Sequence, residues 1–111
     1  METVTYTLKY KQGTTFRLNF KIRNKETDTY WDFTGWTAKL SIKSSVNATT
    51  SLLEATEADY ISLDGTQFAL TIPSSALSVL PTGNHVYDLD LSSPTEDDYT
   101  PLSGKFLVTW G

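Results

Sequence analysis

Apolar and polar side chains alternate along several short segments of the chain. In each segment one row of residues is mainly apolar and the other mainly polar, which is the period of a strand buried on one face. Turn-forming residues separate most of the segments, so the pattern predicts an all-β protein. The segments comprise residues 3–10, 16–23, 36–43, 60–63, 68–72, 85–91 and 102–110.

The stretch around Pro81 indicates how the strands are arranged. Tyr87 follows a Leu-Pro corner early in a strand, as does the tyrosine of the corner motif in immunoglobulin-like sandwiches. There the ring fills the edge of the core and the hydroxyl binds backbone upstream. Asp88 and Asp90 share the opposite face, which must meet water because burying two unpaired carboxylates would cost too much.

A short helical turn is expected just before this strand. Residues 74–80 contain Ser74 and Ser75, either of which suits an N-cap. About seven antiparallel strands, with a short helical turn before the sixth, are typical of an immunoglobulin-like β-sandwich. We therefore predict a single domain of this class over residues 1–111.

Two segments lack the alternating pattern. Residues 24–35 are polar and rich in turn formers, so they are expected to form a loop. In the Ser- and Thr-rich stretch 44–59, Leu52 and Leu53 indicate either a short edge strand or an anchored loop. Residues 54–59 are expected to form no more than a helical turn.

Composition narrows the function classes. The chain has 111 residues, 39% of them hydrophobic and 13% aromatic, and no cysteine, so its stability rests on the core and the sheets. A net charge of −4 argues against binding nucleic acid, which requires clustered Lys and Arg. The start of the chain does not resemble a signal peptide, and no apolar run reaches the roughly 18 residues of a membrane span. We therefore expect a protein made in a cytoplasm, with no membrane partner.

Candidate catalytic chemistry is sparse. His85 is the only histidine, which excludes a pair of histidines at a metal or at an acid–base centre. A Ser-His-Asp triad would need this residue, but its inward position in a strand favours a core-edge histidine with one hydrogen bond. We predict that the protein has no catalytic residues and is not an enzyme.

Acidic residues gather near the sixth strand and the loop after it. Asp88, Asp90 and residues 96–98 could supply oxygen ligands to calcium. The loop lacks the Asp-x-Asp-x-Asp-Gly spacing of a recognisable calcium site, and solvated loop carboxylates are the commoner case. We predict no metal and no cofactor, and leave open whether the loop around Asp97 and Asp98 binds a cation.

Aromatic residues are the first candidates for a binding surface. The alternation places Trp36 and Trp110 on inward positions, where they would belong to the core. Tyr30 and Trp31 fall in the polar loop, where large rings are harder to explain as packing. They are expected to contact a protein partner, the alternative being a platform for a sugar.

Charged residues form a second set of candidates. The outward positions of the second and third segments are basic, whereas the loop after the sixth strand is acidic. Opposite charges on one small domain suit head-to-tail or ring assembly. The residues expected to take part are Arg17, Lys21 and Lys39 on the basic side, with Asp97 and Asp98 on the acidic side.

Four motifs, in this order and spacing, resemble the immunoglobulin-like N-terminal domains of siphophage baseplate upper proteins and similar tail-associated proteins. They are residues 13–20 (GTTFRLNF), 32–42 (DFTGWTAKLSI), 80–89 (LPTGNHVYDL) and 102–108 (LSGKFLV). The resemblance implies a structural component of a phage virion, in its tail, baseplate, connector or fibre-attachment site. Such a protein would assemble with itself and with other virion proteins. The alternative function is a small carbohydrate-binding or adhesion module that uses Tyr30 and Trp31.

Overall fold

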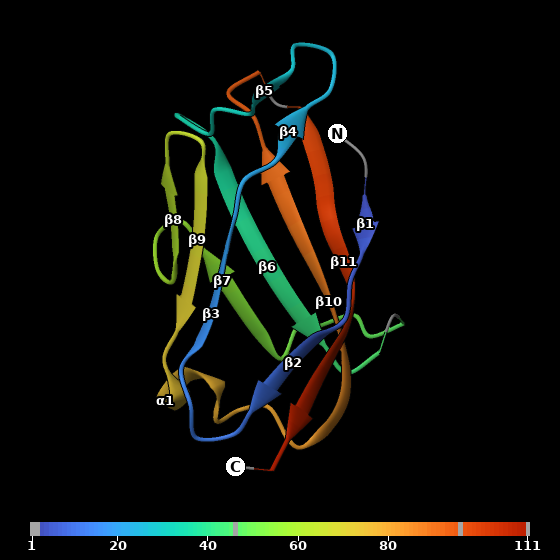
Figure 1. Ribbon diagram of the computed structural model, residues 1–111. Coiled ribbons are helices and arrows are strands. Elements are labelled where there is room, and N and C mark those ends of the chain that lie inside the picture. Colours follow the sequence, from blue (N-terminus) through green and yellow to red (C-terminus); the bar gives the residue numbers. More distant parts are fainter. Residues whose placement is uncertain (1–2, 46, 96, 111) are drawn as a thin grey trace.

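Two β-sheets packed face to face build the protein (Figure 1). The computed structural model describes residues 3–45, 47–95 and 97–110. The larger sheet has the order β1-β11-β10-β6-β7, with β2 pairing to the same edge of β11 as β1, and the smaller has the order β3-β9-β8. The larger sheet consists of β1 (Val4–Thr5), β2 (Leu8–Lys11), β6 (Thr37–Lys43), β7 (Leu53–Thr56), β10 (Gly83–Ser92) and β11 (Asp98–Thr109). The smaller consists of β3 (Phe16–Phe20), β8 (Ile61–Asp64) and β9 (Gln67–Ile72).

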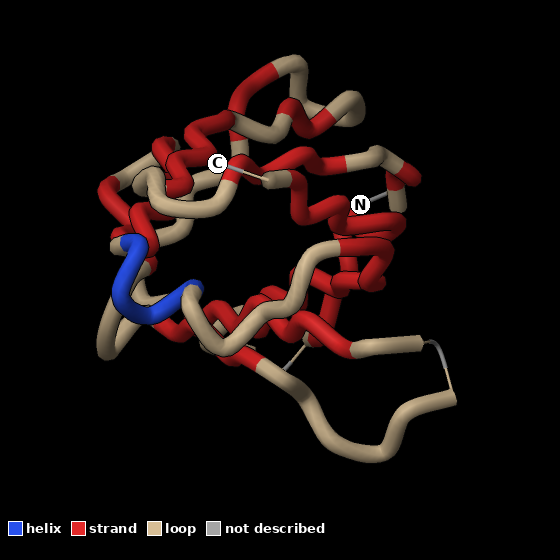
Figure 2. Tube along the Cα trace, turned by 90° about the horizontal axis from the view of Figure 1, so that it is seen from below, coloured by secondary structure: helices blue, strands red, loops and turns tan. Residues whose placement is uncertain are grey.

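Three further features complete the architecture. A hairpin of β4 (Arg23–Asn24) and β5 (Thr29–Tyr30) lies at the upper end of the molecule in Figure 1. Helix α1 (Ser74–Leu77) lies at the lower end, beside the strands, as the view from below shows (Figure 2). The molecule is elongated, measuring 42 × 26 × 21 Å along its principal axes.

The inward rows of the two sheets make one core. With the exception of Ala55, they come from the alternating positions that the sequence identified. The predicted immunoglobulin-like β-sandwich is therefore confirmed, including the helical turn between β9 and β10. Phe33 closes the core at the upper end, and Leu77 and Leu80 belong to its buried cluster beside α1. The inward residues of the larger sheet are Leu8, Tyr10, Ala38, Leu40, Ile42, Ala55, His85, Tyr87, Leu89, Leu91, Phe106 and Val108. Those of the smaller sheet are Phe16, Ile61, Phe68, Leu70 and Ile72.

Several local predictions are corrected. Residues 54–56 belong to edge strand β7 rather than to a helical turn, because Ala55 packs into the core and the segment pairs with β6. Of the two alternatives for Leu52 and Leu53, the edge strand is confirmed at Leu53. The polar loop 24–35 contains part of the β4–β5 hairpin. The first predicted strand is split into β1 and β2, and both pair with β11 in parallel rather than antiparallel. The N-cap of α1 is Pro73, and neither Ser74 nor Ser75 caps it.

The junction between β1 and β2 is held by Tyr87. Its ring is buried, and its hydroxyl donates to the carbonyl oxygen of Tyr6 at 2.6 Å. The predicted bond from this hydroxyl to upstream backbone is therefore present, but its acceptor lies 81 residues away rather than at the neighbouring corner. Tyr6 is fixed a second time because its N–H donates to the carbonyl oxygen of Ser103 at 2.9 Å.

Gly104 makes this junction possible. It pairs with Tyr87 in the β10–β11 ladder and has a φ of +144°, in the region that favours glycine. A Cβ at this position would lie 2.6 Å from the carbonyl oxygen of Tyr6, well inside contact distance. The backbone of Tyr6 thus occupies the space that a side chain at position 104 would need.

Replacing Tyr87 with Phe removes the hydroxyl and leaves the Tyr6 carbonyl without its side-chain donor. We expect the free energy of unfolding to fall by about 1 kcal/mol, together with faster hydrogen exchange in residues 4–8. Chemical denaturation and exchange mass spectrometry measure the two effects. Tyr60→Phe is the matched control, since the Tyr60 hydroxyl bonds no residue in the described part of the chain. Equal behaviour of the two variants would contradict the role given to Tyr87.

Because the Tyr87 phenol is buried, we also expect the protein to lose stability at alkaline pH. Burial raises the pKa of its phenol to about 12 from the ordinary 10.0, with smaller contributions from Tyr6 and Asp88. The native state therefore holds this proton more tightly than the unfolded chain does. The resulting stability is complete below pH 10 and is lost as the pH rises from 10.0 toward about 12. Denaturation curves measured across this pH range should show that the free energy of unfolding falls less steeply with pH for Tyr87→Phe than for the native chain. An equally steep fall in both proteins would contradict the raised pKa of Tyr87.

Candidate functional site

Four aromatic side chains cluster at the upper end of the sandwich. Trp36 is central: its ring centroid lies 5.4 Å from that of Phe33, 5.8 Å from Trp31 and 5.8 Å from Tyr99. Trp31 and Tyr99 are also 6.0 Å apart. Only Phe33 is fully buried, whereas the other three are partly exposed. The cluster is thus the outer end of the core, and it presents aromatic surface to solvent.

A short turn positions two of these rings. Asp32 accepts hydrogen bonds from the backbone N–H and the hydroxyl of Thr34, at 2.9 and 2.7 Å. These bonds hold the pKa of Asp32 below its ordinary value, since they favour the charged form. Phe33 donates its N–H to the carbonyl oxygen of Gly65 at 2.7 Å, which ties the turn to the β8–β9 hairpin. The turn therefore directs Phe33 inward and leaves Trp36 at the rim.

Tyr99 joins the cluster because of an irregularity in β11. Leu102 pairs with Leu89, but Tyr99 rather than the residue at position 100 pairs with Leu91, so β11 carries one extra residue near Pro101. The extra residue reverses which side chains point inward, and this turns Tyr99 toward Trp36. Tyr99 was not among the residues predicted from the sequence. Pro101 was the available signal, since a proline within a paired strand marks an edge or a bulge.

A groove of about 520 Å³ opens beside the cluster. Its apolar walls are Trp31, Tyr99, Ile22 and Val4, and its polar side is formed by residues 23–26. The groove is bounded by β1, by the segment that leads into the β4–β5 hairpin and by the start of β11. We call this surface the aromatic groove.

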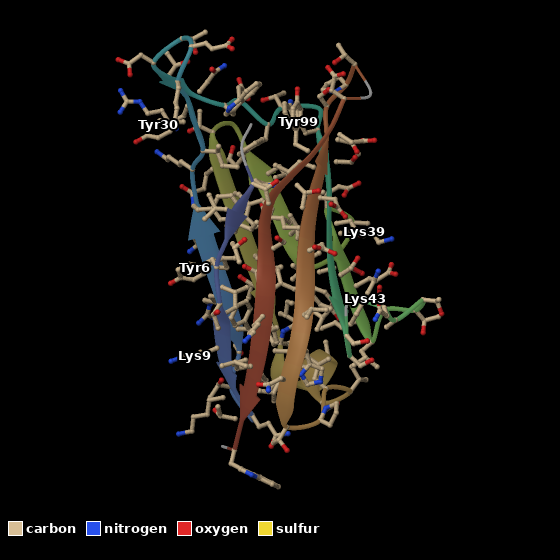
Figure 3. The ribbon with its side chains drawn as sticks, turned by 90° about the vertical axis from the view of Figure 1, so that its right-hand side faces the viewer. Tyr6, Lys9, Tyr30, Lys39, Lys43 and Tyr99 are labelled. Atoms are coloured by element: carbon tan, nitrogen blue, oxygen red, sulfur yellow. The ribbon has the colours of Figure 1, made fainter. Side chains whose placement is uncertain are left out.

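Tyr30 lies at the same end of the molecule as Tyr99 (Figure 3). It is 53% exposed, and the Lys21 amine lies 5.3 Å from the centre of its ring. The neighbouring Trp31 is different, because it packs on Trp36 and against the core. Of the two predicted contact residues, Tyr30 is a solvent-facing ring and Trp31 is a wall of the aromatic groove.

The predicted basic residues do not form one patch. Arg17 and Lys21 belong to β3 and the segment after it, on the smaller sheet, whereas Lys39 lies on β6 in the larger sheet. Lys39 pairs with Glu54 at 3.4 Å and lies opposite Asp90 in the ladder. Its charge is therefore balanced within its own sheet.

The predicted acidic residues shape a turn. Asp98 accepts a hydrogen bond from the Ser92 hydroxyl at 2.6 Å, and Asp97 accepts one from the Thr95 hydroxyl at 3.0 Å. Both carboxylates are exposed, and they lie in the segment that leads to Tyr99. Glu96, the third acidic residue considered for a cation, lies outside the described residues.

His85 lies in the core as predicted, with 4% of its surface exposed, but its Nδ1 atom is buried without a partner. One hydrogen bond was expected for this side chain, and its Nδ1 atom makes none with the residues that the structure describes. Across residues 3–45, 47–95 and 97–110, no group of three His, Asp or Glu side chains is placed to hold a metal ion. The helices within the same ranges include none with the length and apolar character needed to cross a membrane.

Trp110 is a further correction. The alternation assigned it to the core, but it is 80% exposed. The reason is that β11 ends at Thr109, and the last ladder partners, Gly83 on β10 and Lys11 on β2, pair with residues 108 and 109. An inward position beyond the last pair has nothing to pack against.

Comparison with known proteins supports the fold. No protein-family model matches the chain, and no curated protein does. Among solved structures, the chain is similar to one from photo-crosslinking work on the multimeric cell-adhesive interactions of VGSC beta subunits. The TM-score is 0.52 with 13% sequence identity over 98% of both chains. At this identity the likeness shows an immunoglobulin-like fold and nothing about function.

Trp36→Ala should weaken both the fold and the groove. It removes three ring contacts, one of them with Trp31, so we expect a loss of about 2 kcal/mol in the free energy of unfolding. Because Trp31 then becomes more exposed to water, the remaining tryptophan emission should shift to longer wavelength. Trp110→Ala is the control, and its free energy of unfolding should match that of the native chain. A Trp36→Ala variant as stable as this control would contradict the central position given to Trp36.

Proposed function

We propose that this protein is a non-enzymatic structural component of a bacteriophage particle, in its tail, baseplate, connector or fibre-attachment site. It acts by assembling with itself and with other virion proteins. The resemblance of four motifs to tail-associated immunoglobulin-like domains supports the phage context. The immunoglobulin-like fold supports an interaction module without catalysis, as does the burial of the single histidine within the core.

The aromatic groove is the observation that carries the proposal. Its walls come from β1, from the segment between β3 and β6 and from β11, so it is held by the sandwich rather than by one loop. Aromatic side chains at a preformed, partly apolar surface are the residues that most often dominate binding between proteins. Trp31 and Tyr99 therefore mark this end as a surface for another protein chain.

A second candidate is a carbohydrate-binding or adhesion module that uses the same end. Trp31 and Tyr99 favour it, since aromatic rings that combine apolar and polar parts suit sugars as well as proteins. Against it, Tyr99 is stacked on Trp36 with an angle of 22° between the ring planes, and Trp31 contacts both rings. Ring faces already engaged in this way leave less flat surface for a sugar.

Light scattering at increasing protein concentration tests the proposal against this second candidate. We expect the solution mass to rise above that of the monomer, and tryptophan fluorescence to stay unchanged when glycans are added. A saturable glycan response that disappears in Trp31→Ala, from a chain that remains monomeric, would favour the binding module. Hydrolysis of an ester, glycoside or phosphate substrate above background would overturn the non-enzymatic assignment.

A further inference from the structure

An exposed tryptophan and a tryptophan-lined groove lie at opposite ends of the molecule. Trp110 is 80% exposed and makes no ring contact with any described residue. It follows directly after the end of β11, at the lower end where the chain's C-terminus is marked (Figure 1). A large apolar side chain held outside its own core is the kind of group that anchors an interface.

The aromatic groove lies at the other end of the same strand. Tyr99, one of its walls, is the second residue of β11, which runs for 12 residues to Thr109. At about 3.4 Å per residue, roughly 35 Å separates the groove from Trp110. The two features cannot meet within one molecule, so an occupant of the groove must come from elsewhere.

The charges at the two ends are complementary. Residues 9–15, 73–86 and 105–110, at the lower end, contain three lysines and no acidic residue. Lys11 pairs with Thr109, the neighbour of Trp110, so the strand end that carries the tryptophan lies at this basic end of the molecule. Residues 21–36, 92–95 and 97–99, at the upper end, contain three basic and five acidic residues.

The polar side of the groove itself contains the charged residues Arg23, Lys25 and Glu26. Arg23, on its polar side, is paired with Asp28, and Lys25 is also engaged within the chain. Asp97 and Asp98 are exposed next to Tyr99. The upper end as a whole therefore carries more acidic than basic residues, which suits the approach of the basic lower end of another copy.

We infer that Trp110 of one copy of this protein docks into the aromatic groove of the next copy. This inference rests on the self-assembly included in the proposed function, and it assigns the contact. The contact joins two different surfaces, so each copy keeps a free tryptophan at one end and a free groove at the other. Such a contact builds a ring or a linear array rather than a closed dimer of identical faces.

Sedimentation velocity with complementary variants tests this contact. Trp110→Ala removes the inserted side chain and keeps the groove, whereas Trp31→Ala removes a wall of the groove and keeps Trp110. We expect each variant alone to remain monomeric at concentrations where the native chain associates, with a dissociation constant at least tenfold higher. An equimolar mixture of the two should form a dimer and stop there, because each variant supplies the half that the other lacks.

A second groove variant, a control variant and a change of salt concentration complete the test. Val4→Arg narrows the groove from the edge of β1 without touching the ring contacts, so it should block association even if Trp31→Ala disturbs the fold. Leu52→Ala changes another exposed apolar residue, away from both ends of β11, and should associate like the native chain. Raising the salt from about 0.05 to 0.5 M should weaken association, since the two ends of the molecule carry opposite charge.

The outcomes separate this contact from the proposed function. Native association that persists in both variants overturns the contact and leaves self-assembly in place. Monomeric variants whose mixture is also monomeric overturn the head-to-tail arrangement. A native chain that is monomeric at every concentration overturns both the contact and the self-assembly part of the proposed function.

Discussion

The hydrogen bond from Tyr87 to the carbonyl oxygen of Tyr6 is the constraint on which the edge of the larger sheet depends. Strands β1 and β2 cover the outer edge of β11, which would otherwise present a long row of unpaired N–H and C=O groups. Between these two short strands the chain continues along the same edge, and the backbone of Tyr6 occupies the space above Gly104. The buried Tyr87 hydroxyl on β10 and the absence of a side chain at Gly104 on β11 thus hold in place the strands that cover the outer edge of β11.

Strand β11 links this junction to both ends of the molecule. Its regular lower part pairs with β2 and β10, and it carries the alternation past the last pair to Trp110. Its upper part contains the extra residue near Pro101, which turns Tyr99 inward. The same strand therefore leaves one aromatic residue outside the core and brings another into the cluster. The two ends differ because the pairing continues at one and is interrupted at the other.

Much of this fold could be predicted from alternation, because a one-residue error would expose a whole row of apolar side chains. Strands β3, β6, β9 and β10 were found in this way. The split of the first strand was not predicted, since the acceptor of the Tyr87 hydroxyl depends on a contact between distant parts of the chain. Tyr99 and Trp110 were misjudged for a related reason. Alternation states which face a residue takes, but not where pairing shifts or stops.

The candidate site could be predicted from the sequence only in part, for the same reason. Tyr30 and Trp31 were identified because large rings in a polar loop have no local explanation, and the structure places them at one end with Tyr99. The basic residues were grouped by sign alone, and sign does not reveal that Arg17 and Lys39 lie on different sheets. A surface of a sandwich is assembled across strands that are remote in sequence. For that reason the residues that complete the groove, Val4 and Tyr99, come from the two strands at its edge.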